Sequence, residues 1–191
     1  MTARPSPISR SSTLKPSTSP LSTTPTTLIS ASAFCTGLHL ITLGSKTIVQ
    51  LRARLTSSYG PIAVGDGCIL SERVSIGLLR PPENEQEAKG VTLSAGVLIE
   101  TGAVVEGASI GAYTIIEAGA KIGKGAVVGA NSKVCAGVEI GEGAIVEDDT
   151  VVFGSGWGEM RKEKKGLGLD GMRKVWVDSQ ADTLRSMWTG K

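Results

Sequence analysis

The chain has 191 residues, of which 40% are hydrophobic but only 4% aromatic, and 25 are glycine. This composition predicts one domain whose core is built from Val, Ile, Leu and Ala. The charge is +3 in residues 1–27, −4 in 28–153 and +3 in 154–191, and no basic cluster indicates nucleic-acid binding. No apolar run reaches the ~18 residues of a membrane-spanning helix, so we expect a soluble protein.

The three cysteines, Cys35, Cys68 and Cys135, are odd in number and far apart in the sequence. They form no C-x-x-C pair, which argues against a disulfide framework and against a thiolate metal site. We therefore expect the protein in a reducing compartment, either the cytosol or the nucleus.

The first segment, residues 1–27, contains seven Ser, seven Thr and five Pro and almost no large apolar side chain. It cannot bury enough apolar surface to offset chain entropy, which predicts a disordered tail. Its basic residues and lack of acidic ones also match a mitochondrial transit peptide, although the prolines oppose the amphipathic helix of such signals. Plain disorder, a phosphorylated tail and a transit signal all stay open.

From residue 93 onward, large apolar residues recur at a step of six, which fits neither an α-helix nor a single strand. Short strands separated by regular corners explain this step, so residues 93–153 are predicted to form a parallel β-helix, a prism of stacked coils. The same step upstream extends the predicted β-helix to residues 28–154. The predicted inward residues are Leu43, Val49, Leu55, Val64, Leu70, Ile76, Leu93, Ile99, Val105, Ile110, Ile116, Ile122, Val128, Val134, Ile140, Val146 and Val152.

From Leu93 onward, the residue three positions after each inward residue is predicted to form a corner with left-handed backbone dihedrals, because it is mostly a residue that tolerates them, such as Gly or Asn. One step, from Val105 to Ile110, is five residues long, and this rule puts Ala108 at its corner. Lys121 and Glu139 are 18 residues apart and should stack as opposite charges if three hexads make one coil.

The stretch 80–90 breaks the repeat with prolines and acidic residues, so it is predicted to leave the prism as a corner loop. Insertions at corners are where repeat proteins usually carry specificity. Glu100 and Glu117 each follow an inward residue in successive coils, so like charges should stack on one face. They are either merely solvated or a contact surface for a basic partner.

Residues 155–191 are predicted to form a basic linker and a segment with helical spacing. The stretch 179–182 has capping-box spacing, which leaves one helix and two short helices equally open. All three tryptophans of the chain fall here, so we expect the segment to pack on the prism or on a partner. The candidate capping or partner-contact residues are Trp157, Met172, Trp176, Leu184 and Trp188.

The hexads I-G-K-G-A-V (122–127) and I-G-E-G-A-I (140–145) resemble those of the hexapeptide-repeat family. That resemblance implies an all-β fold, a left-handed parallel β-helix with three flat faces, here followed by a C-terminal α-helical segment. The handedness is taken from the family, since parallel crossovers are otherwise right-handed.

Three stretches, 60–72, 151–154 and 167–174, resemble the β-helical subunits of the pointed-end complex of dynactin. The resemblance implies a non-catalytic scaffold that supports dynein-driven transport and cargo engagement in the cytoplasm and cytoskeleton. The implied partners are the dynactin subunit 5 homologue, the subunit 4 homologue and the pointed-end actin-related protein, with no nucleic acid, no membrane insertion and no cofactor. The chain departs from that pattern in its short insertion at 80–90 and in its Ser/Thr/Pro-rich tail.

Two enzymatic alternatives share the same fold. Hexapeptide-repeat acyltransferases use a histidine as general base, and His39 is the chain's one histidine, in an irregular stretch outside the regular hexads. Carbonic anhydrases of the γ class bind zinc through three histidines, so this chain would be such a subunit without its zinc ligands. Asp66 and Glu72 are possible zinc donors, but they lack the spacing of metal ligands. We therefore expect no catalytic and no metal-binding residue.

Overall fold

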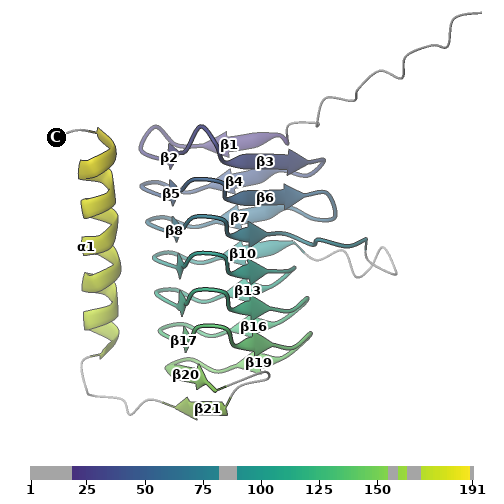
Figure 1. Cartoon of the computed structure of the whole chain (residues 1–191), viewed down its shortest axis with the longest axis vertical. Coiled ribbons are helices and arrows are strands. Elements are labelled where there is room, and N and C mark those ends of the chain that lie inside the picture. Colours follow the sequence, from purple (N-terminus) through teal and green to yellow (C-terminus); the bar gives the residue numbers. More distant parts are fainter. Residues whose placement is uncertain (1–18, 82–89, 155–158, 163–168, 190–191) are drawn as a thin grey trace, which may run out of the picture.

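The computed structural model describes residues 19–81, 90–154, 159–162 and 169–189. In this part the chain forms a prism of stacked coils with one long helix beside it (Figure 1). Three sheets, of seven, eight and six strands, form the three sides of the prism. The predicted parallel β-helix with a C-terminal helical segment is thereby confirmed.

From β1 to β20, each sheet takes every third strand of the chain, and three strands make one coil. Face 1 consists of β1 (Leu21–Thr23), β4 (Ile41–Leu43), β7 (Ile62–Val64), β10 (Val91–Leu93), β13 (Ser109–Ile110), β16 (Val127–Val128) and β19 (Ile145–Val146). Face 2 consists of β2 (Leu28–Ile29), β5 (Ile48–Val49), β8 (Ile69–Leu70), β11 (Leu98–Ile99), β14 (Ile115–Ile116), β17 (Lys133–Val134), β20 (Thr150–Phe153) and β21 (Glu159–Lys162). Face 3 consists of β3 (Phe34–Gly37), β6 (Arg54–Ser57), β9 (Ser75–Ile76), β12 (Val104–Val105), β15 (Lys121–Ile122) and β18 (Glu139–Ile140).

We number the coils from coil 1 (β1–β3) to coil 6 (β16–β18); β19 and β20 begin a seventh. Neighbouring strands are parallel, except that β21 pairs antiparallel with β20. Every inward residue predicted from the six-residue step is buried, and all of them belong to one continuous core along the prism axis. Lys121 pairs with Glu139 in the register and in an ion pair of 2.5 Å, as predicted from their spacing of three hexads.

The predicted corners are confirmed wherever the step is six residues. Gly, Asn, Tyr and Asp residues there have positive φ, from 52° at Asn131 to 72° at Gly102. The prediction for Ala108 is wrong, because Gly107 takes the positive φ of 48° instead. The corner between β12 and β13 has one residue fewer than the corners between β15 and β16 or between β18 and β19. The turn therefore closes one position earlier.

The β-helix begins earlier than residue 28. Strand β1 lies inside the segment that the composition predicts to be a tail, and Leu21 to Thr23 pair with Ile41 to Leu43. Ser19 is buried, and its hydroxyl lies 2.9 Å from that of Ser57. A terminal strand has a neighbour on one side only, so Ser and Thr are tolerated in it. Without an apolar pattern, the sequence alone does not predict a strand there. The predicted boundary is corrected to residue 21, and residues 1–18 lie outside the described part.

The stretch 80–90 does interrupt the coils between β9 and β10, and its residues 82–89 lie outside the described part. After the prism the chain forms one helix, α1 (Leu169–Thr189), and not two. Ser179 and Asp182 are interior positions of α1, so the capping-box spacing there marks no helix start. Within the described residues, no helix combines the length and the apolar character that crossing a membrane requires.

A ladder of small polar side chains runs inside the edge between faces 1 and 2. At the last corner position before face 2, each donates a hydrogen bond to a backbone carbonyl of the next coil. The pairs are Thr27 with Gly44 (2.9 Å), Thr47 with Gly65 (2.8 Å), Cys68 with Ser94 (3.1 Å), Thr114 with Gly129 (2.7 Å) and Ser132 with Glu147 (2.9 Å). Coil 4 has Val97 at this position. Buried carbonyl groups that the strands leave unpaired are satisfied in this way.

Substitution of Thr114 by Val should lower the free energy of unfolding by about 1–3 kcal/mol. The hydroxyl donates to the Gly129 carbonyl and accepts from the Ser132 N–H at 3.2 Å, so both groups lose a partner. Val fits sterically, since Val97 occupies the equivalent position. Urea unfolding followed by circular dichroism measures the loss. The reverse change, Val97→Thr, should be neutral or stabilising, and equal losses in both variants would contradict the role of the ladder.

Candidate functional site

The outer surface of face 2 is apolar, in contrast to the other two faces. Outward residues on face 1 are mostly Ser, Thr and Ala, and those on face 3 include Arg54, Lys121 and Glu139. On face 2 the outward positions of coils 1–5 are apolar without exception: Leu28, Ile48, Ile69, Leu98 and Ile115. The sequence signal is two adjacent apolar residues in every face-2 strand of these coils, which a search for single inward residues overlooks.

Helix α1 covers this apolar surface and lies along the prism axis (Figure 1). Val177 and Ala181 are buried against the face-2 side chains, and Leu184 is half-buried beside them. An α-helix rises about 1.5 Å per residue, and coils are about 4.8 Å apart, so three to four helical residues match one coil. The i, i+4, i+7 spacing of these three residues along α1 therefore matches the distance between successive coils.

Polar contacts hold α1 at the edge between faces 1 and 2. The guanidinium of Arg173 donates to the carbonyl of Asn131, and that of Arg185 donates to the carbonyl of Lys46. The ammonium of Lys174 lies 5.7 Å from the centroid of the Tyr113 ring, a cation–π geometry. Lys46, Tyr113 and Asn131 are non-glycine corner residues with positive φ. Three corners of this edge thus contribute to the packing of α1 against the prism.

The predicted C-terminal contact residues fall on different sides of α1. Leu184 packs on the prism, so one predicted residue lies in the interface with the chain's own core. Met172 is 65% exposed, Trp176 43% and Trp188 42%, which leaves these three open to a partner. Trp157 lies outside the described residues.

Glu100 and Glu117 hold neighbouring coils together at the edge between faces 2 and 3. The carboxylate of Glu100 accepts from the Ala118 N–H at 3.2 Å, and that of Glu117 accepts from the Ala136 N–H at 3.0 Å. Glu117 also pairs with Lys133 at 2.6 Å, and this hydrogen bond raises the pKa of Lys133. The two carboxylates therefore join neighbouring coils of the chain itself, a role that the sequence alone does not predict.

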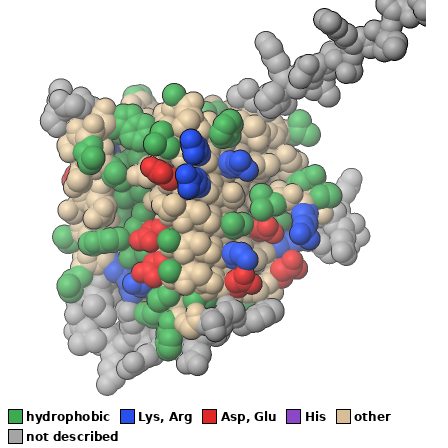
Figure 2. All heavy atoms as spheres, in the orientation of Figure 1, with side chains coloured by type: hydrophobic (Ala, Val, Ile, Leu, Met, Phe, Trp, Pro, Cys, Tyr) green, Lys and Arg blue, Asp and Glu red, His purple; other side chains and the backbone are tan. Residues whose placement is uncertain are grey.

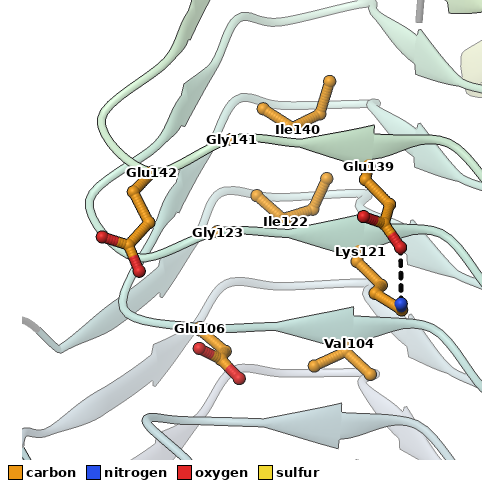
Figure 3. Close-up of a pocket in the computed structure, with 9 residues that line it drawn as sticks. All are labelled: Val104, Glu106, Lys121, Ile122, Gly123, Glu139, Ile140, Gly141 and Glu142. Carbon is orange, nitrogen blue, oxygen red and sulfur yellow. Dashed lines mark hydrogen bonds and ion pairs between the residues drawn. The ribbon is translucent and has the colours of Figure 1, made fainter. Parts of the chain in front are cut away.

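An open hollow of about 500 Å³ lies at the edge between faces 3 and 1, over coils 4–6 (Figure 3). Its rim carries the ion pair of Lys121 with Glu139, and the carboxylates of Glu106 and Glu142 (Figure 3). It lies where the corner after Glu106 is one residue short and where Gly123 and Gly141 add no side chain. None of the nine lining residues is a Cys, His, Ser or Thr, so no hydroxyl, thiol or imidazole group lines the hollow.

A family model described as bacterial transferase hexapeptide (six repeats) matches residues 119–154, which contain β15 of coil 5, the whole of coil 6, and β19 and β20. The chain is a hexapeptide-repeat β-helix. A crystal structure of a hexapeptide transferase family protein from Anaplasma phagocytophilum superposes on it with a TM-score of 0.72 and 15% sequence identity. The superposition covers 92% of this chain and 98% of that one, and it shows a common fold.

Curated relatives of this hexapeptide-repeat β-helix include two dynactin subunits 6. The protein of Danio rerio is 27% identical over 120 residues, which are 60% of this chain and 62% of the relative. The protein of Nematostella vectensis is 28% identical over 118 residues, 60% of this chain and 64% of the relative. The matched stretch thus spans less than two thirds of either relative.

His39 of the hexapeptide-repeat β-helix is exposed at the corner between coils 1 and 2. Its backbone N–H donates to the Ser57 carbonyl at 3.1 Å, and its carbonyl accepts from the Ser57 hydroxyl at 2.7 Å. The hollow starts at coil 4, about 14 Å away at roughly 4.8 Å per coil. The structure therefore does not bring the one histidine to the hollow.

The cysteines of the hexapeptide-repeat β-helix are apart from one another and poorly suited to thiolate chemistry. Desolvation by burial raises the pKa of the Cys68 thiol to about 12, and burial also raises the pKa of Cys35 and Cys135. In the described ranges, no group of three or more His, Cys, Asp or Glu side chains could hold a metal ion. Asp66 instead accepts a hydrogen bond from the Ser45 N–H at 2.5 Å.

Proposed function

We propose that this protein is a non-catalytic scaffold subunit of a dynactin pointed-end complex, where it supports dynein-driven transport along microtubules and cargo engagement. The observation that carries the proposal is its similarity to two dynactin subunits 6 over 60% of the chain. The site chemistry agrees with it, since neither the hollow nor the covered face 2 is lined by a histidine base or by a cysteine.

The prism itself is suited to a scaffold. Its coils form one continuous core, so the faces and ends keep a fixed geometry for several partners at once. At the N-terminal end, β1, β2 and β3 are the last strands of their sheets among the described residues, and unpaired strand edges favour association. The proposed partners are the dynactin subunit 5 homologue, the subunit 4 homologue and the pointed-end actin-related protein, in the cytoplasm and cytoskeleton.

Affinity purification of the tagged chain from its own cells tests the proposal. Recovery of the subunit 5 homologue, the subunit 4 homologue and the actin-related protein in one complex is the expected result. A stable homotrimer that brings down none of them would overturn it and favour the enzymatic alternatives.

The fold shared with a hexapeptide transferase family protein keeps acyl transfer as a second candidate, with His39 as its base. Acetyl transfer from acetyl-CoA by the wild type but not by His39→Ala would establish it. Equal background rates for both proteins would remove it, and the exposed position of His39, remote from the hollow, favours that outcome.

A further inference from the structure

The edge between faces 2 and 3 carries arginines where the backbone favours glycine. At its third corner position, coils 4, 5 and 6 have Gly102, Gly119 and Gly137, all with positive φ. Coils 2 and 3 have Arg52 and Arg73 there, both with φ of 58°. A residue with a Cβ is strained in this conformation, and strain of this kind is typically retained at functional positions.

The two arginines are close neighbours in space. The N–H of Arg73 donates to the carbonyl of Leu51 at 3.1 Å, which joins the two corners directly. Arg54, the first residue of β6, is also exposed and lies next to this edge. Within the described ranges, none of the three guanidinium groups forms an ion pair. The described part of the chain therefore holds no carboxylate in direct contact with them.

An apolar groove adjoins these arginines. It has a volume of about 320 Å³ and lies between the last turns of α1 and the corners of coils 2 and 3. Leu51 is 50% exposed there, Met187 77% and Trp188 42%. Its lining residues are Gln50, Leu51, Glu72, Leu184, Met187 and Trp188. Exposed aromatic, Met and Leu side chains beside arginines are the composition of an interface core and its rim.

The charge of the prism restricts the partner further. Described residues 19–81 carry five basic and two acidic side chains, whereas residues 90–154 carry three basic and eight acidic ones. Figure 2 shows a group of basic side chains over the N-terminal coils, with an acidic side chain beside it, and acidic side chains mixed with basic ones toward the other end. An acidic ligand is thus favoured at the N-terminal coils, which carry the arginine edge, over the far coils.

We propose that Arg52, Arg54 and Arg73 and the adjoining groove form a docking site for an acidic peptide segment with an apolar anchor, supplied by another protein. The apolar side chain enters between Leu51 and Trp188, and carboxylates of the segment pair with the guanidinium groups. Arginine binds carboxylates in a planar, two-pronged geometry, so the stacked pair suits successive acidic residues. The site is independent of the identity of the complex in which the protein works.

Fluorescence anisotropy with a labelled synthetic peptide that repeats Glu-Leu-Glu tests the proposal on the full chain. Wild type should bind it more tightly than matched peptides with Gln for Glu or Ser for Leu. The double variant Arg52→Gly, Arg73→Gly should weaken binding on the order of tenfold, from about two- to fivefold per lost charge contact. Leu51→Ser should remove the preference for Leu over Ser in the peptide.

Control variants separate this site from general electrostatics. Arg80→Gln removes one exposed positive charge on coil 3, the coil of Arg73, and should leave binding unchanged. The double glycine variant should keep or slightly raise the unfolding temperature, because Gly is native at this position in the next three coils. Equal binding by wild type and the double variant, or an equal loss in Arg80→Gln, would overturn the proposal.

Two other occupants have distinct signatures. If the arginines serve contact with a second copy, wild type elutes as an oligomer on size exclusion and the double glycine variant does not. If they serve a lipid surface, vesicles of phosphatidylserine bind in an arginine-dependent way while the peptide does not bind. Either result replaces the acidic peptide as the partner.

Discussion

Gly77→Ala should destabilise the protein by on the order of 3–5 kcal/mol. Gly77 has a φ of 117°, a region that residues with a Cβ rarely adopt, and its N–H is held by the Val105 carbonyl at 3.0 Å. A Cβ there would lie 2.0 Å from the carbonyl oxygen of Thr56 in the preceding coil, coil 2. The added methyl group must therefore push two coils apart.

Gly119→Ala is the matched control for this prediction. Gly119 also has positive φ, of 69°, but a Cβ there meets nothing within 4 Å. The loss should be limited to the dihedral cost of about 1–2 kcal/mol. Thermal and urea unfolding, followed by circular dichroism, compare the two variants. If both lose the same stability, close contact between coils at Gly77 does not limit the packing.

The repeating part of the fold could be predicted because the six-residue step encodes it locally. Each inward residue, such as Ile99 or Ile116, is fixed by its own hexad, and the corner three residues later follows from backbone sterics. The ion pair of Lys121 with Glu139 followed from the same arithmetic. Of the first coil, only β1 lies outside the predicted range, because Leu21 to Thr23 carry no apolar repeat and become a strand only through pairing with β4.

The surfaces were harder to predict because they depend on the register of three faces. The surface on which α1 packs can be predicted only after the strands are assigned to faces. It consists of outward residues that lie on one side of the prism: Ile48, Ile69, Leu98 and Ile115. The role of Glu117 likewise depends on an N–H in the next coil. The hollow lies beside the short corner after Glu106; the five-residue step in the sequence marks that corner but does not predict a hollow.

Val177→Asp should detach α1 from the prism while the coils stay folded. Val177 is fully buried against the outward side chains of face 2, in a cluster separate from the central core. An unpaired carboxylate in this apolar contact costs several kcal/mol, on the order of the 2–5 kcal/mol that large losses of packing cost. Detachment uncovers a row of apolar side chains, so dye binding by 8-anilinonaphthalene-1-sulfonate and aggregation should rise, and α1 should become sensitive to proteases.

Val175→Asp supplies the comparison, because it places the same charge two residues away on the outer side of α1, where Val175 is 68% exposed. That variant should keep wild-type dye binding and protease resistance. The β-sheet signal in circular dichroism should be unchanged in both, since the core of the prism is built from its own inward residues. Loss of that signal in Val177→Asp would mean that α1 is required for the coils to fold, and equal behaviour of the two variants would contradict the docking contact itself.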